Sequence, residues 1–418
     1  MDFQTRYAKL NANQRQAVDY IHGSLLVIAG PGTGKTELLS MRTAQILRQT
    51  DTLPDSILCL TFTESGAANM RQRLRQIIGE DAYKIAIHTF HSFGTEIINQ
   101  HREYFFHGAD AQPADELTQH QIVTGILEGL DWRNPLSVKN NGEFVYTNEL
   151  IRVISEFKQS GLTPAELRAI TADNQRVIAD ITADVQQVFA AKISKKTIEL
   201  FAPLAEKIAE RVGEGKSAKT SKGGATELSK NTTSSAPNNT ATTAQNSANL
   251  PSSITPYAHV LALSIAHVAQ EAIDTNSTKP LTAWKNKWCE KNAAGEFVLK
   301  DFTASEKLSA AIDVYEAYGN VLAERSLFDY DDMILSVIQA CESHPELRAN
   351  LQEQFQFIMV DEFQDTNLAQ LRLLFDLTGD EDNPNIMAVG DDDQAIYSFQ
   401  GADVGNIHRF RKQYPNHA

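Results

Sequence analysis

Short apolar segments, each bounded by turn residues, recur near both ends of the chain. Five such runs predict buried β-strands: Leu25–Ala29, Ile57–Thr61, Ile85–His88, Phe357–Val360 and Ile386–Val389. Continuous apolar runs of this length are typical of a parallel sheet that is covered on both faces. Helical patterns follow the first two strands, at Thr36–Arg48 and Gly66–Ile78. This alternation of strand and helix predicts a doubly wound α/β domain.

The segment between the two groups of strands is mostly helical in pattern. Asn148–Gln159 has the apolar spacing of an amphipathic helix, with Ile151, Ile154 and Phe157 on one face. Thr163, followed by a proline and then by a glutamate three positions on, has the pattern of a helix start. We therefore predict a mainly helical domain inserted between strands of one sheet.

This interpretation divides the chain into a sheet domain, residues 1–98 and 322–418, and an insertion, residues 99–321. Within the insertion, residues 217–256 contain no aromatic residue and few large apolar ones. Such a segment cannot bury enough surface to offset the entropy of ordering. We predict a disordered linker there, with a segment that contacts DNA or a partner protein as the alternative.

The amino-acid composition says more about the class of protein than about its ligand. A net charge of −15 argues against a uniformly basic coat for nucleic acid, but it leaves room for a local basic groove. The three cysteines form no CxxC pair, so neither a zinc site nor a disulfide framework is expected, and a reducing cytoplasm fits. Cys59 lies in an apolar run and is expected to be a buried, unreactive thiol. We expect neither a signal peptide nor a membrane span.

The strongest chemical signal directly follows the first predicted strand. The segment Ala29-Gly30-Pro31-Gly32-Thr33-Gly34-Lys35-Thr36 matches a phosphate-binding loop in position and spacing, with Ala29 where the simplest pattern has glycine. Glycines let backbone N–H groups converge on a triphosphate at a helix N-terminus, where the dipole favours anions. We expect Lys35 to reach the β- and γ-phosphates and the Thr36 hydroxyl to bind Mg²⁺.

A second signal, the pair Asp361-Glu362, follows the predicted strand Phe357–Val360. The strand delivers two adjacent carboxylates to the carboxyl edge of the sheet, where open α/β sheets bind ligands. We expect Asp361 to hold Mg²⁺ through its coordination shell and Glu362 to accept a proton from the attacking water. An ordinary helix N-cap is the alternative, which the nearby phosphate-binding loop makes less favoured.

Six sequence blocks distinguish between the classes of P-loop protein. In chain order they are Leu10–Ala17, Thr61–Thr63 with Ala67–Arg71, Thr89–Phe93, Phe328–Asp332, Asp361–Thr366 and Gly390–Ala402. They resemble, in the same order, the motifs of superfamily 1 DNA helicases of the UvrD/Rep/PcrA type. The resemblance brackets nearly the whole chain, although residues 100–320 match weakly.

The resemblance implies a RecA-like P-loop NTPase fold and an ATP-driven helicase and translocase on single-stranded DNA and duplex/single-strand junctions. It also implies 3′→5′ polarity and a role in DNA repair or recombination. Gln14 would hydrogen-bond the adenine, and Gln394 would sense the γ-phosphate. The residues implied for contact with DNA, by base stacking or through the backbone, are Phe62, Thr63, Thr89, His91, Tyr397 and Phe399. Core packing is the alternative for the three aromatic residues, and a structural role for His91.

Three segments depart from the family pattern. Glu37 stands where relatives usually have an arginine that covers the adenine, so affinity for the base is expected to rest more on Gln14. The segment Glu64-Ser65-Gly66 replaces Asn-Lys-Ala and removes one positive charge from the DNA groove. Phe399 stands in place of tryptophan and keeps a smaller stacking face.

The resemblance also implies a second RecA-like domain beyond Ala418, which would supply arginines that stabilise the γ-phosphate in the transition state. Such arginines contribute about 10³–10⁵ in rate in related systems. We therefore expect these 418 residues to bind ATP weakly, hydrolyse it slowly and not unwind DNA alone. The segment Thr63–Ala67 further resembles bacterial helicases that continue into a RecB-like nuclease.

Two other classes of protein are alternatives to an ATP-driven DNA helicase. One is a non-catalytic, nucleotide-switched DNA-binding subunit, which would have no need of the general base Glu362. The other is a P-loop kinase or GTPase, which predicts a guanine-reading or acceptor-phosphate motif that we do not find in the sequence.

Overall fold

The computed structural model describes residues 3–30, 32–105, 111–190, 257–292, 295–300, 302–379, 383–391 and 405–418, together with a few positions between 193 and 206. The chain divides into two compact units: unit 1 is residues 1–163 with 313–418, and unit 2 is residues 164–312. The predicted boundaries, after residues 98 and 321, separate the sheet domain from the insertion and not one compact unit from the other. These boundaries therefore stay a prediction.

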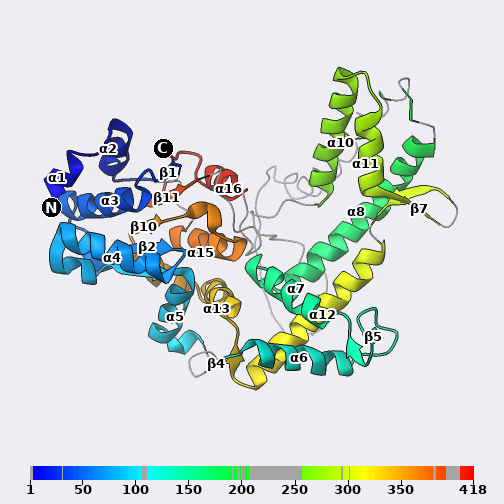
Figure 1. The fold of residues 1–418 in the computed structure, drawn as a ribbon, viewed down its shortest axis with the longest axis horizontal. Coiled ribbons are helices and arrows are strands. Elements are labelled where there is room, and N and C mark those ends of the chain that lie inside the picture. The colour runs from blue at the N-terminus through cyan, green and yellow to red at the C-terminus, as the bar shows by residue number, and fades with distance from the viewer. Residues whose placement is uncertain are drawn as a thin grey trace, which may run out of the picture. The chain divides into compact units, whose positions relative to one another are not determined.

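Unit 1 is built on a five-stranded parallel sheet with the strand order β1-β11-β10-β2-β3. The strands are β1 (Leu25–Ile28), β2 (Ile57–Thr61), β3 (Ala86–Thr89), β10 (Phe357–Val360) and β11 (Ile386–Gly390). All five predicted strands are present, and no end differs from its prediction by more than one residue. Two strands from the C-terminal part of the chain lie between β1 and β2, so distant segments of the sequence complete one sheet (Figure 1).

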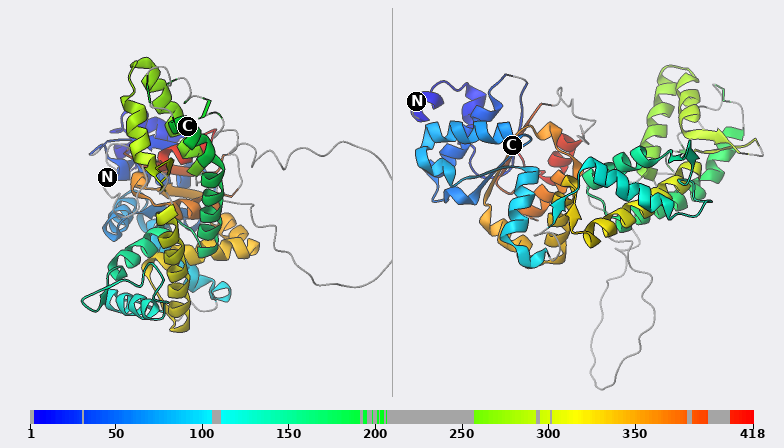
Figure 2. Two further views of the ribbon diagram at one scale, coloured as in Figure 1. Left: turned by 90° about the vertical axis from the view of Figure 1, so that its right-hand side faces the viewer. Right: turned by 60° about the horizontal axis from the view of Figure 1, so that its bottom comes forward.

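Alternate residues of the central strands point to opposite faces of the sheet, and each face has its own hydrophobic core. Cys59 and Met359 pack in the core of one face, whereas Leu60 and Val360 pack in the core of the other. The first face is covered by α1 (Phe3–Tyr7), α2 (Ala12–Asp19), α3 (Lys35–Gln49) and α4 (Glu64–Ile78), and the second by α5 (Phe90–Gln100), α13 (Tyr330–Ser343), α14 (Pro345–Gln354), α15 (Leu368–Thr378) and α16 (Asn406–Gln413). Figure 2 shows the blue N-terminal helices and the orange and red C-terminal helices on opposite sides of the strands. The predicted doubly wound α/β fold is confirmed.

Burial also accounts for the behaviour expected of Cys59. Its side chain is fully buried in β2, and burial raises the pKa of the thiol to about 12. The thiol therefore stays protonated at neutral pH, as expected for an unreactive cysteine.

Two longer helices, the second part of α12 (Phe302–Glu324) and several short elements complete unit 1. The two longer helices and the short elements are α6 (Glu116–Glu128), α7 (Thr147–Gln159), the parallel pair β4 (Gln112–Pro113) and β9 (Leu327–Phe328), the hairpin β5 (Lys139–Asn140) and β6 (Glu143–Phe144), and the short 3₁₀ turns η1 (Pro54–Ser56), η2 (Gly79–Tyr83), η3 (Arg102–Tyr104) and η5 (Phe363–Asp365). The helix predicted at Asn148–Gln159 is α7. Ile154 is buried there together with Leu150 and Lys158, and Ile151 and Phe157 are half-buried.

Unit 2 is a helical unit with one hairpin. It contains α8 (Pro164–Ala190), α10 (Tyr257–Asp274), α11 (Lys279–Trp288), β7 (Cys289–Lys291), β8 (Phe297–Leu299) and the first part of α12 (Phe302–Glu324). Its core is rich in aromatic rings, including Phe189, Phe201 and Trp284. Helix α8 begins at Pro164, as predicted. Among the described helices of both units, none has the length and apolar character needed to cross a membrane.

Candidate active site at the carboxyl edge of the sheet

A glycine-containing loop joins the carboxyl end of β1 to the N-terminus of α3. Gly32 and Gly34 have φ angles of 71° and 84°, a region that residues with a Cβ rarely occupy. The backbone N–H of Ala29 donates to the carbonyl of Gly390 at 2.9 Å, which ties the start of the loop to β11. The loop therefore holds the N-terminus of α3 at the sheet edge, where N–H groups and the helix dipole favour an anion.

Two side chains at the start of α3 face two carboxylates at the end of β10. The Lys35 ammonium lies 2.7 Å from a carboxylate oxygen of Glu362, and the Thr36 hydroxyl donates to a carboxylate oxygen of Asp361 at 3.0 Å. The partners are 327 and 325 positions apart in the sequence, so the sheet alone brings them together. The Lys35 side chain is 9% exposed and that of Glu362 is 39% exposed, so the ion pair is open to solvent on the carboxylate side.

The chemistry of Asp361 suits a divalent cation. The side chain is buried, and burial together with the charge of Glu362 raises the pKa of its carboxyl. A cation next to Asp361 would offset both effects. Mg²⁺ in phosphate-transfer sites takes one or two protein oxygens and completes its shell with water and phosphate. The Thr36 hydroxyl and the Asp361 carboxylate fit that pattern.

A glutamine that the sequence analysis did not single out connects the acidic pair to the neighbouring strand. The Gln364 amide nitrogen donates to carboxylate oxygens of Glu362 at 2.9 Å and of Asp365 at 3.2 Å. Its amide oxygen accepts the backbone N–H of Asp391 at 2.9 Å. A Cβ at position 390 would lie 2.9 Å from that oxygen, so Gly390 leaves the room that the amide needs. Gln364 therefore links the position of Glu362 to the end of β11.

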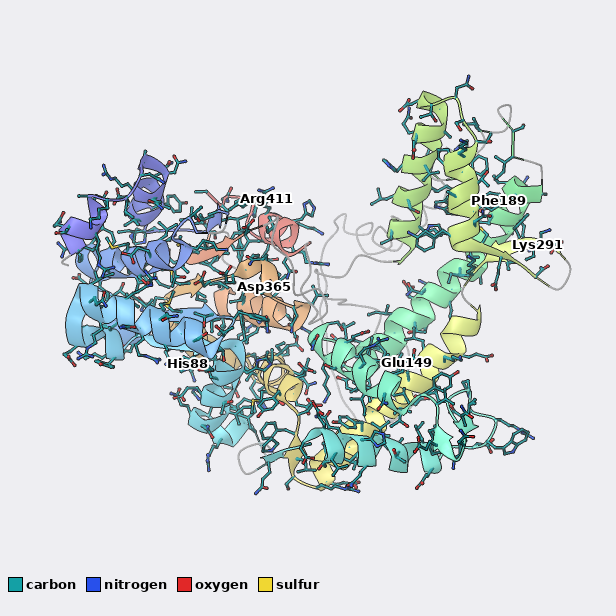
Figure 3. The ribbon with its side chains drawn as sticks, viewed as in Figure 1. His88, Glu149, Phe189, Lys291, Asp365 and Arg411 are labelled. Atoms are coloured by element: carbon teal, nitrogen blue, oxygen red, sulfur yellow. The ribbon has the colours of Figure 1, made fainter. Side chains whose placement is uncertain are left out.

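Backbone strain and negative charge both concentrate around Glu362. Its φ and ψ of 50° and 47° place a residue with a Cβ in the left-handed region, at a cost of about 1–2 kcal/mol. Burial and the charge of Glu362 raise the pKa of Asp365 to about 6. Figure 3 shows Asp365 among the elements of the sheet domain. Backbone strain and closely spaced carboxylates are typical of a functional site rather than of a simple helix cap.

Gln14 lies beside the phosphate-binding loop and is already engaged. Its amide nitrogen donates to the carbonyl of Thr33 at 3.0 Å. Its amide oxygen accepts the backbone N–H of Asn11 at 2.9 Å, and Asn11 in turn caps α2. The capping box therefore fixes the position of Gln14 beside the loop. One hydrogen of its amide nitrogen is donated to Thr33, and the other is available to donate to an adenine.

Glu37, in the first turn of α3, forms ion pairs with two arginines. Its carboxylate oxygens lie 2.7 Å from the Arg6 guanidinium and 2.8 Å from the Arg73 guanidinium. Burial alone would raise the pKa of Glu37, but the hydrogen bonds from the two arginines outweigh it and lower that pKa. The acidic residue at this position thus holds positive charge close to the phosphate-binding loop, a compensation that the sequence alone does not show.

The residues implied for DNA contact that the structure describes lie at the ends of β2 and β3. Phe62 is half-buried directly after β2, and Thr63 caps α4 by accepting the backbone N–H of Gly66 at 3.0 Å. Thr89 is buried, caps α5, and donates its hydroxyl to Glu64 at 2.9 Å. The hydroxyl predicted to contact a DNA phosphate therefore lies against a carboxylate.

His91 is half-buried in the first turn of α5. Its ring lies edge-on to Tyr330 with the ring centroids 6.5 Å apart. Burial lowers the pKa of His91, although the charge of Asp331 acts in the opposite direction. The imidazole is therefore neutral at physiological pH, and it would meet a phosphate as a hydrogen-bonding group rather than as a cation.

Several predicted site residues lie outside the described residues. They are Pro31 in the phosphate-binding loop, Gln394, Tyr397 and Phe399 after β11, and the predicted linker at residues 217–256. Asp391 is the last described residue before the block that contains Gln394, and it is the residue that Gln364 contacts.

Comparison with known proteins gives one family. The model of the UvrD/REP helicase N-terminal domain matches residues 10–202 and 203–415. The chain is 25% identical over 414 residues to DNA helicase II of Rickettsia typhi, which covers 97% of this chain and 40% of that protein. It is 25% identical to the ATP-dependent DNA helicases PcrA of Staphylococcus aureus, over 406 residues, and of Bacillus subtilis, over 407 residues. Each of these two matches covers 97% of this chain and 36% of the relative, so the chain spans about two fifths of the length of the relatives it matches.

Proposed function

The chain belongs to the UvrD/REP helicase family, and from that premise we propose that it forms the first ATP-binding part of a DNA-dependent ATPase and helicase. ATP is the proposed nucleotide and Mg²⁺ the proposed metal. The observation that carries the proposal is the pairing of Lys35 with Glu362 and of Thr36 with Asp361 across the sheet edge.

This geometry supports a specific exchange when ATP binds. The γ-phosphate competes with Glu362 for the Lys35 ammonium, because both are anions that reach the N-terminus of α3. Once Lys35 contacts phosphate oxygens, Glu362 loses its cation and becomes free to accept a proton from a water molecule. Mg²⁺, when bound by Thr36 and Asp361, supplies charge neutralisation at the phosphates. Gln364 holds Glu362 in place during the exchange through its hydrogen bond of 2.9 Å.

The rival class, a nucleotide-switched subunit without catalysis, needs Lys35 and Thr36 but not an oriented general base. The strained backbone of Glu362 and its hydrogen bond from Gln364 favour hydrolysis over a clamp, because both features fix the position of this carboxylate. A P-loop kinase or GTPase is not compatible with the family that the chain belongs to.

The remaining parts of the proposal rest on resemblance. We propose single-stranded DNA and duplex/single-strand junctions as substrates, 3′→5′ translocation, and a role in repair or recombination. Phe62, Thr63, Thr89 and His91 are the proposed DNA contacts among the described residues, with Tyr397 and Phe399 outside them. Gln14 is proposed to read the adenine and Gln394 to sense the γ-phosphate. The second RecA-like domain expected beyond Ala418 stays a prediction.

Single-stranded-DNA-stimulated ATP turnover by the full-length protein tests the proposal. Wild-type turnover should rise on addition of oligo-dT, and Glu362→Gln should lower it by about 10²–10⁴-fold, the usual contribution of a general base. Glu362→Gln should still bind ATP, because the phosphate-binding loop is intact. Unchanged turnover in Glu362→Gln would refute the catalytic assignment, and tight ATP binding without turnover in the wild type would favour the clamp.

A further inference from the structure

An arginine of α1 reaches the first turn of α3. One terminal nitrogen of the Arg6 guanidinium lies 2.7 Å from a carboxylate oxygen of Glu37, and the other donates to the side-chain oxygen of Gln76 at 2.5 Å. The second carboxylate oxygen of Glu37 lies 2.8 Å from Arg73, on α4. We call Arg6, Glu37, Arg73 and Gln76 the Glu37 network. It joins α1, α3 and α4, which Figure 1 shows at one end of unit 1.

The Glu37 network borders the phosphate-binding loop. A Cβ built at Gly34 would lie 3.9 Å from the Cβ of Glu37, so this side chain starts beside the loop. Gln14 contacts the adjacent loop residue, Thr33, through its hydrogen bond of 3.0 Å. The base of a nucleotide is joined to its phosphates only through one ribose. When the phosphates occupy the loop, residues that border the loop are therefore those that can contact the base.

The hydrogen bonds of Arg6 use the edge of its guanidinium group. Its side chain is 16% exposed, and its two terminal nitrogens donate to Glu37 and Gln76. All N–H groups of a guanidinium lie in its plane, so these contacts leave its flat faces for another group. Arg48, in contrast, lies over the ring of Phe3 with its guanidinium 4.6 Å from the ring centroid. Within the described part of the chain, Arg6 covers no aromatic ring.

The charge of Glu37 favours a neutral ligand group for Arg6. Burial acts to raise the pKa of Glu37, but the hydrogen bonds from Arg6 and Arg73 outweigh it and lower that pKa. The carboxylate is therefore ionised at neutral pH, offsets the charge of Arg6 and repels a phosphate. A nucleotide base is neutral and aromatic, and it stacks on the planar, delocalised charge of a guanidinium. The base thus fits Arg6 better than the phosphates do.

We propose that Arg6 stacks on the base of the bound nucleoside triphosphate and that Glu37 positions Arg6 for this contact. The inference rests on the proposed function, because it assumes a nucleotide in the phosphate-binding loop. Arg6 covers one face of the base, while Gln14 hydrogen-bonds its edge. Arg73 holds the Glu37 carboxylate from the other side. Helix α1 therefore contributes to nucleotide affinity, although it lies outside the loop and outside the sheet.

The test measures two ligands on variants of the 418-residue chain. Magnesium ATP and magnesium tripolyphosphate, which has the phosphates but no base, are each competed against a fluorescent ATP analogue. Arg6→Gln removes the guanidinium, whereas Arg6→Lys keeps a positive charge that can pair with Glu37 but has no flat face. The control is Arg48→Gln. Arg48 also contacts α1, through Phe3, but it lies in the last turn of α3, away from the loop.

The quantity compared is the ratio of the affinity for ATP to the affinity for tripolyphosphate. Arg6→Gln and Arg6→Lys should both lower this ratio by about 3–10-fold, the range expected for loss of a cation–π contact. Arg48→Gln should leave the ratio at its wild-type value. Glu37→Ala should lower the ratio as Arg6→Gln does, and the double variant should lose little more, because the two residues act as one unit. Thermal unfolding followed by circular dichroism checks that each variant is folded.

The same ratio in Arg6→Gln and in the control would overturn the proposal. An equal loss of affinity for both ligands would also overturn it, and would assign Arg6 to the phosphates or to the fold. A wild-type ratio in Arg6→Lys would show that charge, and not the flat face, is what matters.

The wild-type chain distinguishes these failures from failure of the proposed function. If the wild type binds ATP and the full-length protein shows DNA-stimulated ATP turnover, only the Arg6 assignment is wrong. Absence of ATP binding by the wild type would refute the proposed function and, with it, the role of Arg6.

Discussion

Lys158 and Lys35, both in unit 1, each pair with carboxylates from a distant part of the chain, and the two clusters differ in burial and in the number of partners. Lys158, on α7, is 1% exposed and lies 2.6 Å from Asp329 and 2.5 Å from Asp332, with its ammonium 4.9 Å from the ring of Tyr318. Lys35 has Glu362 as its carboxylate partner within 4 Å, and that partner is 39% exposed.

The same kind of ion pair, between a lysine and a carboxylate, has a structural role in one cluster and a ligand-binding role in the other. The Lys158 ammonium contacts two carboxylates and a ring, and the cluster joins α7 to the start of α13. Lys35 is buried on its own side but meets an accessible carboxylate, so a phosphate can replace that partner. Removal of a partner from a closed cluster leaves a buried charge, whereas removal from an open pair lets water in.

The largest effect is expected from Lys158→Met. It leaves the half-buried carboxylates of Asp329 and Asp332 side by side without a cation, which should lower the free energy of unfolding by about 3–5 kcal/mol. Urea denaturation of the 418-residue chain measures this. Adding Asp329→Asn and Asp332→Asn to Lys158→Met should recover part of the loss, and no recovery would mean that packing rather than charge explains the effect.

Lys35→Met should weaken ATP binding and change stability little, in contrast to Lys158→Met. We expect the affinity for a fluorescent ATP analogue to fall by about 10–100-fold, because a charged hydrogen bond to phosphate contributes about 1.5–3 kcal/mol. The free energy of unfolding should change by less than about 1 kcal/mol, because the Glu362 carboxylate remains accessible to water. A loss of stability as large as that of Lys158→Met would contradict the comparison.

Gln364→Ala should separate positioning from binding at the open pair. Loss of the hydrogen bond to Glu362 should lower ATP turnover by the full-length protein about 10–100-fold, as for other residues that orient a reacting group. The KM for ATP should change little. Gly390→Ala should produce the same split, because its Cβ would lie 2.9 Å from the Gln364 amide oxygen. An unchanged kcat in both variants would exclude the positioning role.

The smallest effect concerns the pH dependence of the closed cluster. Burial raises the pKa of Asp332 to about 6, from a usual value near 4, although Lys158 acts in the opposite direction. Between about pH 4 and pH 6 the folded protein therefore holds a proton that the unfolded chain has lost, and this contribution to stability falls as pH rises. Asp332→Asn should reduce the slope of unfolding free energy against pH by about 1 kcal/mol per pH unit within that window, as measured by urea denaturation at each pH. An unchanged slope would show that Asp332 is ionised throughout.

The parts of the fold that were predicted correctly are those in which local pattern and burial agree. The five strands are continuous apolar runs because both faces of the sheet are covered, so the run itself carries the signal. The phosphate-binding loop was recognisable because glycines at positive φ have few substitutes. The burial of Lys158 on α7 was not predicted, because its carboxylate partner Asp329 lies 171 positions away in the sequence.

By itself, the sequence determined which residues can do chemistry and which elements carry them, because propensity, periodicity and motif spacing act over a few residues. It placed Lys35 and Thr36 at a helix start and Asp361 and Glu362 at a strand end. Only the tertiary structure decided that these groups meet, that Gln364 aims Glu362, and that Glu37 gathers two arginines. Those contacts join positions that the chain keeps apart, and they depend on the order of strands and the packing of helices, which a local pattern does not contain.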